Sequence, residues 1–240
     1  MEFKLSLDHK KLIFLFTLIS ASAANADVNK FRAIHNLYFG GFIFLETVTE
    51  FYSNKSYYKT ITKSSTKGAL NLVFDWKGVV NSTGKINKTR LLPQNYQSLG
   101  RWGEEIWITE LTYNQIGQIT ATKVSPLPDV EEIIPLPLNP EIGAIDPLSF
   151  ISQVVINATT GKSCEEEVAV FDGRRRYKLK VEEIGVEKLS KTPYNIFKGK
   201  ALACKLEYIP LGGQRRQTFE PENPRKEGVI YLAQPTPVTP

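Results

Sequence analysis

Hydrophobic and polar residues alternate with a period of two along most of this chain, and helical spacing is nearly absent. Such alternation is typical of β-strands that bury one face. Gly40 and Gly41 divide the segment 32–52 into two extended runs and predict a bulge or sharp bend. Residues 81–84 (Asn-Ser-Thr-Gly) are expected to end a strand, and residues 114–117 to form a turn. Further strands are predicted at 57–63, 69–80, 104–113, 118–125 and 199–208.

Prolines interrupt the alternation at positions 126, 128, 135, 137, 140 and 147. Proline cannot donate a ladder hydrogen bond, so we expect residues 125–147 to form an extended connection on the surface. The connection leads into a helix, because Asp146 is a good N-cap and Pro147 suits the first helical position. Apolar residues at helical spacing (Leu148, Ile151, Val154 and Val155) then predict a helix over 147–156 that lies across a sheet.

The dipeptide Asp172-Gly173 lies between two alternating runs, which favours a hairpin with a two-residue type I′ turn. That turn would place Phe171 opposite Arg174 and Val168 opposite Tyr177. One face would carry an ion-pair ladder of Glu165, Glu167, Arg176, Lys178 and Lys180. The other face would be apolar apart from Glu166 and Arg175, with Cys164, Val168, Val170, Tyr177, Leu179 and Val181.

Three consecutive arginines follow this turn. Successive residues of a strand point to opposite faces, so the three side chains cannot converge on one ligand. Arg174 and Arg176 are expected on the solvated face. Arg175 lies among apolar residues, where it either pairs with a buried carboxylate (Glu166 or an incoming aspartate), which is the favoured alternative, or holds the polar head of a ligand. Arg175 and Tyr177 are therefore the candidate ligand-binding residues.

Residues 1–26 are predicted to be a secretory signal peptide. Lys4, Lys10 and Lys11 precede the apolar run 12–19, and Ala24-Asn25-Ala26 fits a cleavage site. The run is too short to cross a bilayer, so we expect no transmembrane segment after cleavage. These features predict a secreted protein.

The composition of the chain then limits the partners and the catalytic sites that it could have. After cleavage the chain would carry 27 basic and 23 acidic residues, a mild net charge of +4 that does not indicate a nucleic-acid partner. His35 would be its single histidine, which excludes a metal site built from several histidines, and we expect neither a metal nor a cofactor. The motif G-x-S-x-G is missing, so no catalytic residue is assigned and a non-enzymatic role is favoured. An enzyme that uses carboxylates around Arg175 is the least favoured alternative.

Cys164 and Cys204 are the two cysteines of the chain, and both fall on apolar strand faces. Cys204 alternates with Leu202, Leu206 and Tyr208. In an exported protein with two cysteines we expect a Cys164–Cys204 disulfide, and the alternative is a pair of buried free thiols.

The strand pattern predicts an all-β protein with a single domain over residues 27–233 and a proline-rich tail over 234–240. We expect one long antiparallel sheet, curled into a half-barrel or spiral, with one short helix across its opening. A sandwich of two sheets is the alternative.

Several phrases resemble a known family in order and spacing. They are Tyr38-Phe39-Gly40-Gly41-Phe42, the segment 143–148, Phe171-Asp172-Gly173-Arg174-Arg175-Arg176-Tyr177, and the segment 199–204. The chain is similar to a domain-of-unknown-function family of exported proteins from Gram-negative, chiefly alphaproteobacterial, bacteria. The resemblance implies a periplasmic location and an all-β fold, and it transfers no catalytic residue. Members continue past Tyr231 into further strand sequence, so the proline-rich end of this chain predicts an open sheet edge.

Two functional hypotheses follow. The first is a non-enzymatic binding or carrier protein of the cell envelope that holds an apolar or lipid-like ligand within the curled sheet. The second is a structural or interaction protein with a filled core, which supports the envelope and contacts an envelope protein through residues 125–147 and the tail from Gln234. The sequence leaves the oligomeric state and the identity of the ligand open.

Overall fold

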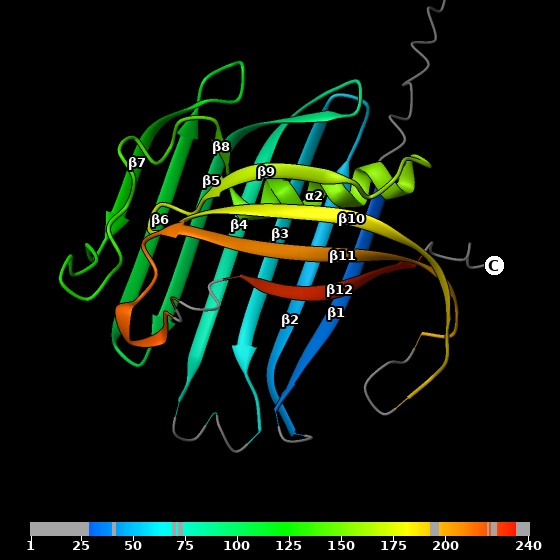
Figure 1. Cartoon of the computed structure of the whole chain (residues 1–240), viewed down its shortest axis with the longest axis horizontal. Helices are drawn as coiled ribbons and strands as arrows, with labels where there is room; N and C mark the ends of the chain where they lie inside the picture. The colour runs from blue at the N-terminus through cyan, green and yellow to red at the C-terminus, as the bar shows by residue number, and fades with distance from the viewer. Residues whose placement is uncertain are drawn as a thin grey trace, which may run out of the picture.

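The computed structural model describes residues 29–39, 42–68, 71, 74–192, 197–219, 221 and 225–233. Within them, a seven-stranded sheet and a five-stranded sheet lie on either side of helix α2 (Pro147–Thr159), and the strands of the smaller sheet cross those of the larger (Figure 1). The predicted signal peptide, the tail 234–240 and the Gly40-Gly41 pair lie outside the described residues.

The long sheet consists of β1 (Asn29–Phe39), β2 (Phe42–Ser53), β3 (Tyr57–Thr66), β4 (Trp76–Asn87), β5 (Arg90–Trp102), β6 (Glu105–Tyr113) and β7 (Ile119–Ser125). The smaller sheet consists, in spatial order, of β12 (Lys226–Ala233), β11 (Gly199–Gly212), β10 (Arg176–Leu189), β9 (Glu166–Phe171) and β8 (Ala144–Ile145). A short 3-10 helix, Arg216–Thr218, follows β11.

Each strand of the long sheet pairs antiparallel with its neighbours in the sequence, and β1 and β7 lie at the two edges. This arrangement confirms the predicted all-β class and the long antiparallel sheet with a short helix. The C-terminal strands do not extend that sheet. They form the smaller sheet, in which β8 pairs parallel with β9.

The long sheet corrects two strand predictions and contains one strand that was not predicted. β1 pairs directly with β2, so the segment 32–52 is a hairpin and not one strand with a bend. β4 continues through residues 81–84, where we expected a strand end, because Ser82 is buried against the helix and Gly84 packs against the Tyr58 ring. β5 was not predicted at all; its Pro93 lies beside the register shift at Thr83 and Gly84, where a proline is tolerated.

Helix α2 begins where the sequence predicts and extends three residues further. The Asp146 side chain accepts a hydrogen bond from the Ser149 backbone amide at 2.8 Å, which is the expected N-cap. Leu148 and Val154 are buried as predicted, whereas Ile151 is half exposed. Polar residues also lie on a buried face of the helix: Ser149, Ser152, Gln153 and Asn157. Both sides of α2 are therefore in contact with a sheet.

The β9–β10 hairpin has a different register from the predicted one. Phe171 pairs with Arg176, and Val170 pairs with Tyr177, so the connection spans four residues, 172–175. The Asp172 carboxylate accepts hydrogen bonds from the backbone amides of Arg174 and Arg175, at 2.9 and 2.7 Å, and this holds the wider loop. The register moves by two residues, and each side chain therefore keeps its predicted face.

The faces of this hairpin agree with the sequence in part. On the solvated face, Lys178 forms an ion pair with Glu167 at 2.8 Å, as predicted. Lys180 pairs with Glu182 of its own strand and not with a glutamate of the predicted ladder. On the opposite face, Val170, Tyr177, Leu179 and Val181 are buried in a core with Phe150 and Val154 of α2.

A disulfide joins Cys164 to Cys204, which confirms the predicted pairing. Both cysteines are fully buried in the core between α2 and the smaller sheet. Cys204 lies on β11, and Cys164 lies just before β9, so the bond connects segments on the two sides of β10. No helix in the described part of the chain is long and apolar enough to cross a membrane.

Candidate ligand-binding cavity

A cavity of about 330 Å³ lies between the first turns of α2 and the smaller sheet. It is lined by Pro147, Phe150, Ile151, Asp172, Arg175, Tyr177, Leu179, Leu206 and Tyr208. Both candidate ligand-binding residues of the sequence analysis, Arg175 and Tyr177, are among them. The volume lies at the lower end of the range of small-molecule sites, roughly 300–1,000 Å³, and the lining is mostly apolar, as in such sites.

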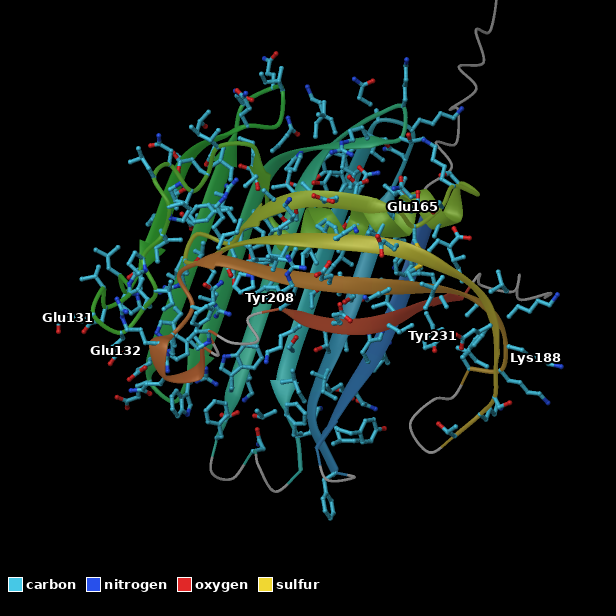
Figure 2. All side chains as sticks on the ribbon, in the orientation of Figure 1. Glu131, Glu132, Glu165, Lys188, Tyr208 and Tyr231 are labelled. Atoms are coloured by element: carbon cyan, nitrogen blue, oxygen red, sulfur yellow. A yellow bond between two sulfur atoms is a disulfide. The ribbon has the colours of Figure 1, made fainter. Side chains whose placement is uncertain are left out.

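The wall formed by the smaller sheet follows from strand alternation. Tyr177 and Leu179 are two residues apart on β10, and Leu206 and Tyr208 are two residues apart on β11, so each pair faces one side. Leu179 pairs with Tyr208 across the ladder. The rings of Tyr177 and Tyr208 lie 4.8 Å apart between centroids. Figure 2 places Tyr208 in the central part of the molecule.

Arg175 lies at the hairpin loop, where its side chain is 56% exposed. Its Nε atom is 4.0 Å from the Asp172 carboxylate, so its partner is Asp172 and not Glu166. Glu166 pairs instead with Arg90 at 2.8 Å. A long and exposed ion pair of this kind is weak, and the guanidinium keeps donors that a bound anion could use.

Two phenol groups lie beside this cation. Burial raises the pKa of Tyr177, and the Asp172 carboxylate raises it further, so the phenol stays a neutral donor. Among the described residues, the Tyr177 hydroxyl has no hydrogen-bond partner. The Tyr208 hydroxyl accepts a hydrogen bond from Gln214 at 3.0 Å and retains its own proton to donate. The cavity therefore offers hydrogen-bond donors at one part of an apolar surface.

Arg176 lies on the same face of β10 as Lys178, as predicted, and both flanking arginines donate to backbone carbonyls. Arg174 donates to the Ser125 carbonyl at 3.0 Å. Arg176 donates to the carbonyls of Pro140 and Ile142. Residues 126–143 lack long ladders, so their carbonyls need other donors, and the arginines provide them. Arg174 and Arg176 thus hold the proline-rich connection, and Arg175 alone of the three lines the cavity.

A second buried polar cluster lies between α2 and the long sheet, and the sequence analysis missed it. Asp146 is fully buried, and its Oδ2 atom accepts hydrogen bonds from the hydroxyls of Ser149 (2.5 Å), Tyr113 (3.1 Å) and Ser82 (3.3 Å). The Tyr58 hydroxyl lies 2.7 Å from Ser149 Oγ. Thr60 and Ser152 form a similar hydroxyl pair at 2.7 Å.

This cluster fixes the helix on the sheet. Burial raises the pKa of Asp146, although hydrogen bonds from Ser149, Tyr113 and Ser82 favour the charged form. The signal in the sequence was the row of hydroxyl residues at alternating strand positions, namely 58, 60 and 82. Their partners are more than sixty residues away, so spacing along the chain did not reveal the cluster.

Other titratable residues lie apart from the cavity. His35 is exposed on β1 opposite Thr47. The adjacent acids Glu131 and Glu132 are exposed at the periphery, on the other side of the molecule from Lys188 (Figure 2). No group of three histidine, cysteine or acidic side chains within the described ranges is arranged to hold a metal ion.

Comparison with known proteins gives one match. No curated protein matches the chain, and no solved structure matches it. A family model described as a protein of unknown function, DUF3108, matches residues 35–239, which include the helix, the smaller sheet, the cavity and the long sheet except the first part of β1. The chain therefore belongs to the DUF3108 family.

Proposed function

We propose that this protein is a non-enzymatic binding or carrier protein that holds an apolar or lipid-like ligand in the cavity between α2 and the smaller sheet. The observation that carries the proposal is the position of Arg175 and Tyr177 in one largely apolar cavity. An apolar surface with a few convergent polar groups is the usual form of a small-molecule site.

The lining indicates an amphipathic ligand. Phe150, Leu179 and Leu206 provide apolar surface, and each buried methylene group of a ligand would gain about 0.8 kcal/mol. Arg175 and the two phenols provide donors for an acceptor head group, such as a carboxylate or a phosphate. Asp172, beside Arg175, would disfavour a head group that carries several negative charges.

Two features support a place in the cell envelope. Residues 1–26 have the composition of a secretory signal, and the buried Cys164–Cys204 disulfide is typical of proteins that fold in an oxidising compartment.

Native mass spectrometry of the gently purified protein tests for a retained ligand. Affinity is then measured with two fluorescent long-chain probes, a carboxylate and the corresponding neutral alcohol. We expect Arg175→Leu to weaken carboxylate binding about tenfold, or roughly 1.4 kcal/mol, and to leave alcohol binding nearly unchanged. Arg174→Leu is the matched control, because that side chain contacts Ser125 and does not line the cavity. Absence of a retained ligand together with no saturable binding of either probe would contradict the proposal.

The second candidate is the interaction protein, and the connection 126–143 favours it. This connection exposes several aliphatic side chains: Leu127, Val130, Leu138 and Ile142. Exposed apolar residues on an extended segment can dock on a partner protein. In-cell cross-linking from position 138 would trap one stable partner under this hypothesis, and a Leu138→Ser variant would lose it. Ligand-free protein that still captures such a partner would favour this function over the first.

A further inference from the structure

The two ends of the long sheet differ in chemistry. Because neighbouring strands run in opposite directions, the β2–β3, β4–β5 and β6–β7 connections lie at one end, which is the upper end in Figure 1. These connections are mostly polar: Asn54-Lys55-Ser56, Lys88-Thr89 and residues 114–118. The β1–β2, β3–β4 and β5–β6 connections lie at the opposite end, which we call the aromatic end.

Large apolar side chains are exposed at the aromatic end. Phe42, which begins β2, is 79% exposed. Trp102, which ends β5, is 43% exposed, and Ile106 of β6 is 52% exposed. Phe74, which precedes β4, packs against Trp102 with 4.5 Å between ring centroids. Apolar side chains in or beside the β1–β2, β3–β4 and β5–β6 connections thus lie at the same end of the long sheet.

A second cavity of about 600 Å³ lies beside two of these residues, Phe74 and Trp102. It is lined by Phe44, Leu45, Thr66, Phe74, Trp76, Trp102, Trp107 and Arg215. Gly78 permits this arrangement, because a Cβ atom there would lie 2.6 Å from the Trp76 ring, which covers the glycine. All three tryptophans of the chain therefore line this one cavity, at the same end as Phe42.

Charges of both signs lie at the aromatic end: the β5–β6 connection carries the exposed Glu104 and Glu105, Arg215 lines the cavity, and other charged residues form pairs. Lys67 lies 2.9 Å from Glu46. Asp75 lies 3.3 Å from Lys77 and 4.0 Å from Arg101. This surface therefore has no strong charge of one sign to attract a nucleic acid or a highly charged protein. It matches a partner that is uncharged on average and accepts aromatic side chains, and the zwitterionic interface of a lipid bilayer has these properties.

We infer that the aromatic end docks on the surface of a lipid bilayer, with Phe42 and Trp102 inserted at the level of the head groups. The cavity beside Trp102 then opens toward the lipid. Aromatic side chains prefer this depth, because their rings are apolar and the indole N–H still reaches polar partners. This inference is independent of the ligand proposed for the cavity beside Arg175.

The experiment uses the intrinsic tryptophan fluorescence of the purified protein with phosphatidylcholine vesicles. All three tryptophans of the chain line the cavity at the aromatic end, so the fluorescence signal reports that end alone. We expect a blue shift of the emission, and quenching when the acyl chains carry bromine atoms. The double variant Phe42→Ser, Ile106→Ser keeps all three reporters and should bind vesicles at least about tenfold more weakly.

Two variants serve as matched controls. Ile116→Ser removes an exposed apolar residue at the polar end, and Leu138→Ser removes one from the proline-rich connection. Both should bind vesicles as the unmodified protein does, and binding should change little between about 50 and about 500 mM salt. Absence of quenching would overturn the inference. Equal losses in the controls, or binding that requires anionic lipid and disappears in salt, would also overturn it.

Discussion

Gly173 lies against Thr109, with no room between them for a Cβ atom. Gly173 is in the β9–β10 loop, and Thr109 is a buried residue of β6, so this contact joins the tip of the smaller sheet to the long sheet. Gly173 also has a positive φ of 87°, which residues with a side chain rarely adopt. Two separate constraints therefore require glycine at this position.

Gly173→Ala should destabilise the protein by about 2–4 kcal/mol, since it adds a clash with Thr109 to the cost of a positive φ. Gly143→Ala separates the two effects, because Gly143 has a φ of 67° and open space around its missing Cβ atom. That control should cost only about 1 kcal/mol. Urea unfolding measures both variants, and similar losses would mean that the Thr109 contact contributes nothing.

Asp146→Ala should lower the free energy of unfolding by about 3–5 kcal/mol. The variant loses an N-cap, at about 1 kcal/mol, and leaves the buried Tyr113 hydroxyl without its acceptor. Asp129→Ala is the control, because the exposed Asp129 side chain accepts one hydrogen bond, from the Glu131 amide. It should change stability by less than about 1 kcal/mol. If denaturant unfolding gives both variants the same loss in free energy of unfolding, the buried hydrogen bonds of Asp146 do not contribute to stability.

The same carboxyl group predicts a pH dependence. Burial raises the pKa of Asp146 above its ordinary value of 3.8, so the folded state binds the proton more tightly than the unfolded state. Its contribution to stability is then fully present below 3.8 and is lost as the pH rises through the folded-state pKa. Unfolding curves of the unmodified protein and Asp146→Asn, measured across this window, should converge or cross as the pH rises. A constant difference would contradict the raised pKa.

Loss of the disulfide should destabilise the smaller sheet. Cys164→Ser and Cys204→Ser should each cost roughly 4 kcal/mol, and the double variant no more than either single one, because one bond is removed in every case. Thiol titration of the unfolded, unreduced protein checks the bond directly. Two reactive thiols per chain would disprove the bridge and would predict that reductant leaves the unfolding curve unchanged.

Arg176→Lys should loosen the proline-rich connection, because lysine cannot donate to the Pro140 and Ile142 carbonyls in the same planar geometry. A glutamate-specific protease reports this change, since Glu131, Glu132 and Glu141 lie in the connection. Cleavage there should become several-fold faster. Arg175→Lys is the control, as Arg175 makes no hydrogen bond to residues 126–143, and its cleavage rate should match that of the unmodified protein.

Local signals in the sequence predicted local features well. Asp146 and Pro147 specify the start of α2 through capping alone, and the structure has the helix at that residue. The disulfide was also predicted, although the hairpin register was wrong. A shift of two residues preserves the face of every side chain, so Tyr177 and Cys164 remained on the buried side.

The same local signals did not predict how segments that are distant in the sequence pack together. Residues 81–84 have the composition of a turn, yet Ser82 and Gly84 continue β4 because the helix and Tyr58 require small residues there. The loop after Phe171 widened because the Asp172 side chain binds two backbone amides, which the Asp-Gly pattern does not reveal. The separation of the C-terminal strands into a second sheet depends on which faces pack on α2, and that is a property of the assembled fold.

The long sheet has the same strand order in space as in the sequence. Each strand therefore pairs with the strand that precedes it in the chain. A chain that is synthesised from its amino end can form these pairs in order, as each new strand emerges. Helix α2 and the smaller sheet follow, and the disulfide waits for Cys204, which comes forty residues after Cys164. The cavity beside Arg175 is consequently completed after the long sheet, whose own pairings need nothing beyond Ser125.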